Sequence, residues 1–458
     1  MQIIADLQLH SKYSRAVSQK MDLEEIAHWS AKKGINLVAT GDWTHPMWIR
    51  EIKARLKETS AGIYCLDENK TDLPSSAKVN FLLSTEISSI YSQGGKGRRV
   101  HNLIFSPSIE TCDKIIKELR RRGANLMSDG RPIVGISSKD LLEMVLTIDK
   151  NVLFIPAHCW TPWFSLYGSK SGFDSIEECF GELANNIYAV ETGLSSDPIM
   201  NWQIKDLDNR SIVSFSDAHS GPKLGREATV FVNNNLPAGR QGQRLTINNF
   251  SFQDITDAIK QIPDSQLKIG YTIEFFPEEG KYHWSGHRVC NVKYNPRQVR
   301  EKGIICPVCH NPLTIGVENR VMDLSYQTLG ESDLILATNG SGVTFVSDKN
   351  KRRKPFVSLV PLLEILTETN NGSHIKALRE YERLTSTFAS EFDILLKKSP
   401  DEIEKNSGSA LRRAVEIIRS RKVFVDPGYD GVFGIVKIFK DESVQTEEKK
   451  AESQPTLF

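Results

Sequence analysis

The feature that most constrains this chain is a pattern in its first half, where short apolar runs end abruptly in an acidic residue, an amide or a histidine. The first run, residues 3–10, is too short for a helix and carries Asp6, Gln8 and His10 at alternate positions. Alternate residues of an extended strand share one face, so these three side chains would point the same way. Oxygen and nitrogen donors gathered at a strand end are what a metal ion requires.

The same pattern recurs along the first half of the chain. Apolar runs at 35–40, 79–85, 152–157, 187–190 and 212–216 lead into Asp42 and His45, Glu86, His158, Glu191, and Asp217 and His219, and the run 100–105 contains His101. Helical segments alternate with these runs: one begins after Asp22 and ends at Gly34, and others cover 108–122 and 138–147. This alternation predicts an α/β fold with parallel strand pairing. The active site of a parallel α/β barrel lies at the carboxyl ends of its strands, so we expect a polynuclear metal site there.

Length and composition set the general class. A chain of 458 residues is expected to form two or three domains. The 58 basic and 57 acidic residues give a net charge of +1, so only local basic runs could attract nucleic acid. No apolar run is long enough to span a bilayer, and the first residues do not form a signal peptide. Seven cysteines, an odd number, argue against a disulfide framework. We therefore expect a cytoplasmic protein without a membrane partner.

These motifs, in this order, resemble those of the polymerase and histidinol phosphatase (PHP) superfamily. The resemblance covers about residues 1–235 and implies a metal-dependent phosphoesterase on a distorted (β/α)7 barrel, which we expect over residues 1–270. It implies one metal held by His10, Glu86 and Asp217 with Gln8 beside them, a second held by Glu86, His101 and His158, and a third served by His219 with Asp42 or His45. It also implies that Asp6 orients His10 through a hydrogen bond.

One departure concerns the metal. The superfamily has a histidine where this chain has Gln8, and an amide oxygen suits Mg²⁺ or Mn²⁺ better than Zn²⁺. We therefore expect zinc in the barrel site together with Mg²⁺ or Mn²⁺ for activity. Besides Asp6, His10, Glu86 and Asp217, the catalytic set would include Arg226. Cations at the barrel mouth could clamp phosphate oxygens or could be solvated surface residues; they are Lys12, Arg15, Lys170 and Arg226.

A second metal site is predicted in the middle of the chain. His287 and Cys290 are followed, after fifteen residues, by Cys306 and Cys309, which is the spacing of a structural zinc site. His283 and His310 are alternatives to His287 as the fourth ligand. We expect a small module over 281–325 whose folding energy comes from the metal.

The segments 286–292, 306–309, 313–317 and 426–434 narrow the resemblance to the endonuclease Q family of DNA repair enzymes. That family nicks DNA on the 5′ side of deaminated bases (uracil, hypoxanthine, xanthine) and of abasic sites, so damaged DNA is the implied partner. Two alternatives stay open. One is a small-molecule phosphoesterase of the superfamily, and the other is a DNA-binding adaptor whose metal site is weakened by Gln8.

The last third is predicted to be mostly helical over 326–440, with helical periodicity at 375–396 and 411–421. The basic run 349–354, which includes Arg352 and Arg353, could bind the DNA backbone or form a solvated loop. Residues 441–458 lack apolar periodicity and are expected to be disordered. They end in a segment that resembles a sliding-clamp-binding peptide, with Gln454, Leu457 and Phe458 as the contacts.

Overall fold

The computed structural model describes residues 2–71, 79–234, 246 and 249–439. They form a mixed α/β fold with a large mixed sheet. None of the helices in these ranges has the length and apolar character needed to cross a bilayer. The predicted clamp peptide with Gln454, Leu457 and Phe458 lies outside the described residues.

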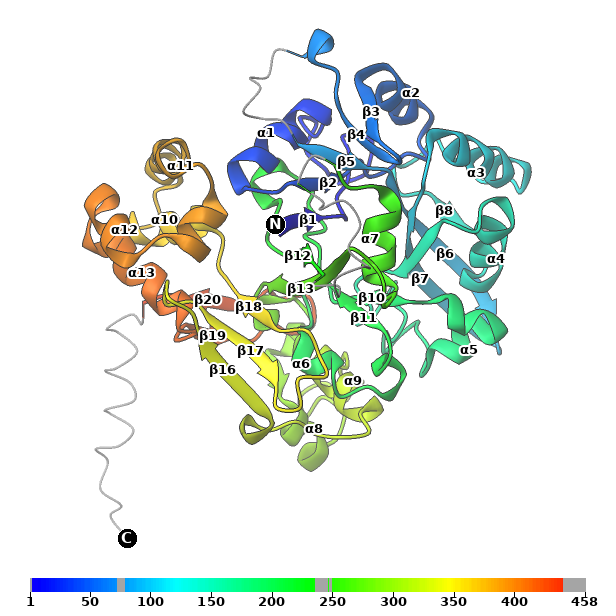
Figure 1. Cartoon of the computed structure of the whole chain (residues 1–458). Helices are drawn as coiled ribbons and strands as arrows, with labels where there is room; N and C mark the ends of the chain where they lie inside the picture. The colour runs from blue at the N-terminus through cyan, green and yellow to red at the C-terminus, as the bar shows by residue number, and fades with distance from the viewer. Residues whose placement is uncertain (1, 72–78, 235–245, 247–248, 440–458) are drawn as a thin grey trace.

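The helices pack around the outside of the strands (Figure 1). The strands are β1 Gln2–Asp6, β2 Leu37–Ala39, β3 Leu56–Ser60, β4 Ile63–Leu66, β5 Asn80–Leu82, β6 Ser84–Gln93, β7 Lys96–Phe105, β8 Ile133–Val134, β9 Leu153–Pro156, β10 Ala189–Glu191, β11 Ser211–Val213, β12 Ala228–Asn233, β13 Leu267–Glu274, β14 Ser285–His287, β15 Val292–Tyr294, β16 Leu334–Thr338, β17 Thr344–Asp348, β18 Phe356–Ser358, β19 Phe424–Asp426 and β20 Ile435–Lys437. The helices are α1 Leu23–Lys33, α2 Pro46–Arg55, α3 Ile109–Arg121, α4 Ser138–Ile148, α5 Ile176–Phe180, α6 Pro198–Asn201, α7 Phe252–Ile259, α8 Pro296–Lys302, α9 Val317–Leu324, α10 Leu362–Thr369, α11 His374–Phe388, α12 Pro400–Ser407 and α13 Ser409–Arg419.

The strands of the first half follow one another in a circuit. Sheet order places β1, β2 and β5 side by side, then β6, β7 and β9 in a second sheet, and β10 beside β11 in a third. The amide of Cys159, after β9, donates to the carbonyl of Glu191 in β10 at 3.0 Å. The amide of His10, after β1, donates to the carbonyl of Ala218, after β11, also at 3.0 Å. The ends of strands far apart in sequence are thereby brought to one rim.

Strand directions differ in part from the prediction. Pairing is parallel between β1 and β2, between β2 and β5, and between β10 and β11, as the alternation of helices and strands predicts. It is antiparallel between β6 and β7 and between β7 and β9, because β6 and β7 form a hairpin without an intervening helix. The predicted parallel pairing is therefore confirmed for three strand pairs and wrong for the pairs that involve β7.

The predicted helix boundaries are confirmed by their caps. The Asp22 side chain accepts a hydrogen bond from the amide of Glu25 at 2.9 Å, and Gly34 ends α1 in the left-handed region with φ 88°. Ser108 and Ser137 accept in the same way at the starts of α3 and α4. The capping residues next to these helices therefore determine where each helix begins or ends.

The prediction of a mostly helical region over 326–440 is wrong for its first part. Strands β16, β17 and β18 extend the main sheet, with β18 parallel to β13. Strand β16 is largely exposed, so its sequence lacks the alternation that marks a half-buried strand. Helices begin only at α10, and β19 and β20 follow α13 as a two-stranded sheet.

A buried ion pair joins the C-terminal helices to the first half of the chain. Lys33 at the end of α1 lies with its Nζ 2.7 Å from Oε2 of Glu391, and both side chains are at most 2% exposed. Glu391 also accepts from the hydroxyl of Tyr381 at 2.9 Å and from the amide of Leu362 at 3.0 Å. Both carboxylate oxygens are thus engaged across the junction.

We expect Lys33→Met to lower the free energy of unfolding by about 3 kcal/mol, because it leaves the buried Glu391 carboxylate without its counter-charge. The matched control is Lys53→Met, which removes the exposed pair with Asp113 and should cost less than about 1 kcal/mol. Urea unfolding of both variants measures the difference. Equal losses would contradict a structural role for the buried pair.

Two buried carboxyl groups lie side by side between β12 and β13. Glu227 is 1% exposed and Glu274 is fully buried. Ser214 donates its hydroxyl to Glu274 Oε1 at 2.6 Å. Burial raises the pKa of Glu274 to about 8, and burial together with the neighbouring Glu274 raises the pKa of Glu227 well above its usual value. The pair is therefore held largely protonated.

This pair predicts a pH-dependent stability. Between pH 4.5 and 8 the folded state retains a proton on Glu274 that the unfolded chain has released, so the free energy of unfolding falls as pH rises through that window, by about 1.4 kcal/mol per pH unit. Glu274→Gln should remove this contribution to the slope, whereas Glu177→Gln at an exposed position of α5 should retain it. Chemical unfolding across the pH range tests this. An unchanged slope in Glu274→Gln would show that Glu274 does not carry it.

Candidate metal centre

Short, sharp turns present the side chains of the site. Asp42, His158 and Asp217 follow β2, β9 and β11, and all three have positive φ angles of 49°, 27° and 48°. Residues other than glycine rarely adopt this conformation, and such strain concentrates at functional sites. Gly193 is also required here, because an added Cβ would lie 2.4 Å from the Cβ of His158.

The first group of potential ligands consists of His10, Asp217 and His219, whose ligand atoms lie within 4.8 Å of one another. Nε2 of His10 lies 3.3 Å from Oδ1 of Asp217. The rings of His10 and His219 meet edge to face with centroids 4.9 Å apart. His10 is fully buried, whereas His219 is partly exposed. The group is therefore closed to solvent on the side of His10 and open to solvent on the side of His219.

The second group consists of Glu86, His101 and His158, again within 4.8 Å. Nδ1 of His101 contacts Oε1 of Glu86 and lies 3.2 Å from Nε2 of His158. The same Oε1 lies 3.5 Å from Nε2 of His158. The second oxygen of Glu86, Oε2, lies 3.1 Å from Nε2 of His10. One carboxylate thus contacts both groups, with one oxygen directed to each.

The electrostatics of the site favour positive charge between the carboxylates. Burial opposes a charge on His10, but Asp42, Asp217 and Glu86 raise its pKa well above the usual value. Burial likewise opposes ionisation of Glu86, but His101, Arg131 and His10 hold the pKa of Glu86 well below its usual range. Burial lowers the pKa of His101 to about 4, which keeps that imidazole neutral and able to act as a ligand.

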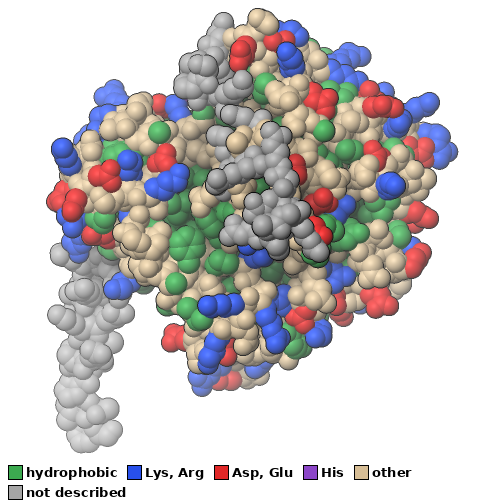
Figure 2. All heavy atoms as spheres, in the orientation of Figure 1, with side chains coloured by type: hydrophobic (Ala, Val, Ile, Leu, Met, Phe, Trp, Pro, Cys, Tyr) green, Lys and Arg blue, Asp and Glu red, His purple; other side chains and the backbone are tan. Residues whose placement is uncertain are grey.

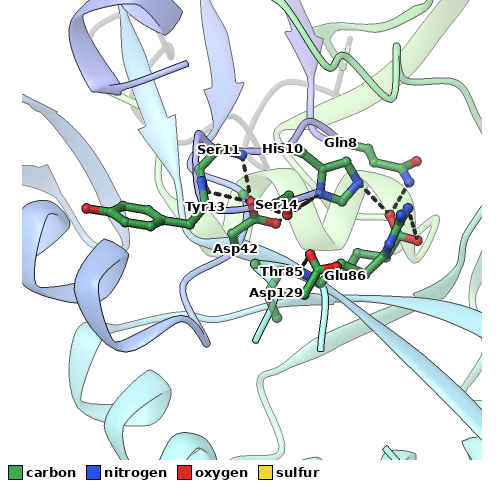
Figure 3. Close-up of polar contacts among 12 residues, drawn as sticks. Gln8, His10, Ser11, Tyr13, Ser14, Asp42, Thr85, Glu86 and Asp129 are labelled. Atoms are coloured by element: carbon green, nitrogen blue, oxygen red, sulfur yellow. Dashed lines mark hydrogen bonds and ion pairs between the residues drawn. The ribbon is translucent and has the colours of Figure 1, made fainter. Parts of the chain in front are cut away.

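Asp42, not Asp6, orients His10 (Figure 3). Oδ1 of Asp42 lies 3.0 Å from Nδ1 of His10, and its Oδ2 accepts from the backbone and hydroxyl of Ser11 and from the hydroxyl of Ser14. Asp6 instead accepts from the amides of Ser216 and Gly225, each at 2.9 Å. The predicted Asp6–His10 hydrogen bond is therefore wrong, and Asp6 fixes the loop that carries Asp217.

Gln8 contacts the centre through its nitrogen. Its Nε2 donates to Oε2 of Glu86 at 2.8 Å, as Figure 3 shows, and its buried Oε1 has no hydrogen-bond partner among the described residues. In this arrangement Gln8 positions the shared carboxylate.

The third predicted ligand group does not assemble. Both oxygens of Asp42 are occupied by His10 and the two serines. His45 stacks on the ring of Tyr13 with centroids 4.5 Å apart and belongs to neither group. His219 joins His10 and Asp217 instead. The prediction that His219 pairs with Asp42 or His45 is therefore wrong.

The predicted cations lie in different settings. Arg226 donates to the carbonyl of Ser216 at 3.2 Å and so supports the Asp217 loop from within. Lys12 pairs with Glu51 at 3.0 Å, Arg15 is mostly exposed beside Asp129, and Lys170 is exposed. The cation nearest the shared carboxylate is one that the sequence did not indicate. Arg131, in the loop before β8, has its Nη1 3.6 Å from Oε1 of Glu86.

The basic run lies elsewhere. Arg353 donates to the carbonyls of Leu207 and Asp208 and pairs with the Asp208 carboxylate, which ties the run to the chain just before β11. Asp217 follows the opposite end of that strand. The guanidinium of Arg353 is therefore held by contacts within the protein, whereas Arg352 is exposed at the edge of a cavity of about 430 Å³.

The four residues of the predicted zinc module come together. The ligand atoms of His287, Cys290, Cys306 and Cys309 lie within 4.8 Å of one another, and Sγ of Cys309 is 3.5 Å from Nδ1 of His287. Burial disfavours the Cys306 thiolate, but the amides of Cys309 and Val308 donate to its sulfur and lower the pKa of Cys306 to about 7. His283, the alternative ligand, faces Glu318 at 3.7 Å.

The donor sets fit metal ions. The barrel rim combines imidazole nitrogens with carboxylate oxygens, and the module combines three thiols with one imidazole, which is a tetrahedral zinc set. Unpaired buried polar atoms are otherwise costly, and Oε1 of Gln8 and Nδ1 of His158 are both buried without a hydrogen-bond partner among the described residues.

Comparison with known proteins gives related sequences and structures. No protein-family model matches the sequence. The chain is 28% identical over 292 residues to the uncharacterized protein MJ0043 of Methanocaldococcus jannaschii, covering 63% of the chain and about a third (32%) of that protein. It is 26% identical over 450 residues to the uncharacterized protein YqxK of Bacillus subtilis, covering 95% of the chain and 99% of that protein.

Two solved structures match nearly the whole chain. The lesion-specific endonuclease PfuEndoQ from Pyrococcus furiosus has a TM-score of 0.76 and 26% identity, over 98% of this chain and 99% of that chain. Endonuclease Q in complex with a 27-mer duplex that carries an abasic lesion at the active site has a TM-score of 0.76 and 27% identity, over 97% and 98%. The chain therefore has the architecture of endonuclease Q over nearly its whole length, which supports the predicted resemblance to that family.

Proposed function

We propose that this protein is a DNA repair endonuclease that hydrolyses the phosphodiester on the 5′ side of deaminated bases or abasic sites. The observation that carries the proposal is the similarity over nearly the whole chain to a lesion-specific endonuclease and to an endonuclease Q bound to duplex DNA with an abasic lesion. The two ligand groups joined by Glu86 support it, because hydrolysis of a phosphodiester needs cations beside the attacked phosphorus.

The barrel rim supplies the chemistry in this proposal. His10, Asp217 and His219 would hold one metal, and Glu86, His101 and His158 a second, on a PHP-type barrel. Such ions lower the pKa of a water molecule and neutralise charge on the phosphate.

The protein's own residues hold this geometry. Asp42 fixes the ring of His10, and Gln8 fixes Glu86. Arg131 lies with its guanidinium close enough to Glu86 to pair with a phosphate oxygen bound at the rim. His219 is the most exposed member of its group, with a side chain 34% exposed, so the group is open to solvent on that side.

The same proposal assigns Zn²⁺ to the module. A closed set of four ligands leaves no open position, so this metal would be structural. The small core beside it contains Val292, Cys306 and Leu313, too few residues to fold the module by themselves. The sliding clamp remains a partner predicted from the sequence.

We expect the wild-type protein with Mg²⁺ or Mn²⁺ to nick a labelled duplex that contains one uracil, hypoxanthine or abasic site. Asp217→Asn should reduce the rate by at least about a hundredfold, because the neutral amide is a poorer metal ligand. Asp113→Asn, in an exposed ion pair, is the matched control and should cleave like wild type. Denaturing gel electrophoresis of the lesion panel measures both. If wild type cleaves a small phosphomonoester and leaves every lesion duplex intact, the small-molecule phosphoesterase is the better assignment.

Metal content separates the enzyme from a DNA-binding adaptor. We expect more than one metal ion per chain by elemental mass spectrometry, with one lost in Cys306→Ser because a hydroxyl does not replace the thiolate. Cys112→Ala, at a buried cysteine outside both sites, should retain the full content. A wild-type content of one zinc per chain, lost entirely in Cys306→Ser, would indicate that the rim is empty and would favour the adaptor.

A further inference from the structure

The glycine-rich segment 426–434 forms a tight turn that is pinned to the start of the zinc module. The amides of Gly428, Gly431 and Gly434 donate to the carbonyls of Glu278, Lys281 and Glu279 at 2.8, 2.9 and 3.0 Å. Tyr429 and Val432 close the turn with two backbone hydrogen bonds to each other, at 3.0 and 2.8 Å. An added Cβ on Gly434 would lie 2.1 Å from the carbonyl oxygen of Glu278. The backbone of the turn is therefore fixed.

This fixed turn exposes two apolar side chains. Phe433 is 64% exposed and Val432 is 40% exposed. Nζ of Lys281 lies 4.4 Å from the centroid of the Phe433 ring, so a cation stands beside the ring. Phe433 and Val432 are neighbours on a rigid backbone, so they present one fixed apolar tip that a partner can contact.

The support beneath the turn rests on the metal-bearing rim. Tyr282 packs its ring against Trp163, in the loop after β9 that begins with His158, with centroids 5.6 Å apart. A Cβ on Gly280 would lie 3.1 Å from Oγ of Ser195, in the loop after β10. Residues 280–282 thus contact both the rim loops and the turn, so the turn that carries Phe433 is attached close to these loops.

The surroundings of the turn favour an anionic partner. Residues 281–310 contain six Lys and Arg against one acidic residue. The two acidic residues of the turn are already engaged, since Asp430 accepts from the amide of Arg288 at 2.7 Å and Asp426 pairs with Lys293. An apolar tip flanked by cations suits duplex DNA, where the cations contact phosphates and the tip contacts bases.

We propose that Phe433, supported by Val432, is a wedge that enters the base stack of duplex DNA beside the lesion and helps to turn the damaged nucleotide toward the metal centre. This inference rests on the proposed endonuclease function. Apolar side chains inserted between base steps unstack them, and removing a target nucleotide from a duplex requires that unstacking. The wedge is needed only when the lesion strand is paired.

The test compares a duplex containing one uracil with the same uracil strand alone. Phe433→Ala should cleave the duplex about tenfold more slowly, because base stacking on an aromatic ring is lost, and should cleave the single strand at nearly the wild-type rate. Phe433→Trp should restore duplex cleavage. Leu336→Ala on β16 is the matched control, since Leu336 is 65% exposed on a different sheet edge, and it should leave both rates unchanged.

A second readout is independent of turnover. In an Asp217→Asn background, 2-aminopurine placed beside the uracil should brighten on binding when Phe433 is present and stay quenched in Phe433→Ala. Suppose that wild type cleaves both substrates and that Phe433→Ala slows neither, or slows both equally. The proposed role of Phe433 as a wedge is then wrong, while the proposed endonuclease function is retained. If wild type cleaves neither substrate, the proposed function fails and the wedge fails with it.

Discussion

The carboxylate of Glu86 is the interaction on which the rest of the site depends. Its two oxygens face opposite groups, Oε2 toward His10 and Oε1 toward His101 and His158. An acid buried at 2% exposure would normally be protonated, but the imidazoles and Arg131 keep its pKa well below the usual range. It can therefore serve as a shared anionic ligand, and β6, which carries it, fixes the distance between the two groups.

The loops around Glu86 are held by two acids, Asp42 and Asp6, that belong to neither ligand group. Asp42 ties His10, Ser11 and Ser14 together, and Asp6 ties Ser216 to Gly225. Each acid occupies the position after or at the end of a short strand and satisfies backbone or hydroxyl donors of a neighbouring loop. The left-handed backbone conformation of Asp42 and Asp217 is unfavourable for residues other than glycine, and these hydrogen bonds stabilise it.

The sequence predicted which residues form the site better than it predicted which of them contact one another. Apolar runs in the sequence pointed to six residues that do meet in two groups, although Glu86 and His101 lie within β6 and β7 and not at a strand end. Which acid would hold His10 could not be found, because it depends on how two neighbouring turns face each other in space. Arg131 was missed because it follows a loop rather than an apolar run.

The fold, like the site, has parts that the sequence predicted correctly and parts that it did not. Helices with local caps, such as the one between Asp22 and Gly34, were predicted correctly. Strands β16–β18 were not: β18 pairs with β13, which lies some eighty residues earlier, and β17 and β16 join the sheet through β18.

The C-terminal segments are best understood as parts of the site rather than as an appended domain. The turn 428–434 is hydrogen-bonded to 278–281, and that segment packs on the loops that follow β9 and β10. The buried pair of Lys33 and Glu391 fixes the helices that precede the turn to the end of α1, which leads into β2. The two attachments lie at different places: the turn is joined through residues 278–282 to the loops that follow β9 and β10, whereas the Lys33–Glu391 pair lies at the end of α1, before β2 begins. The wedge proposed for Phe433 would act on the centre at His10 through the attachment of the turn to the loops after β9 and β10, despite the long separation of the two residues in sequence.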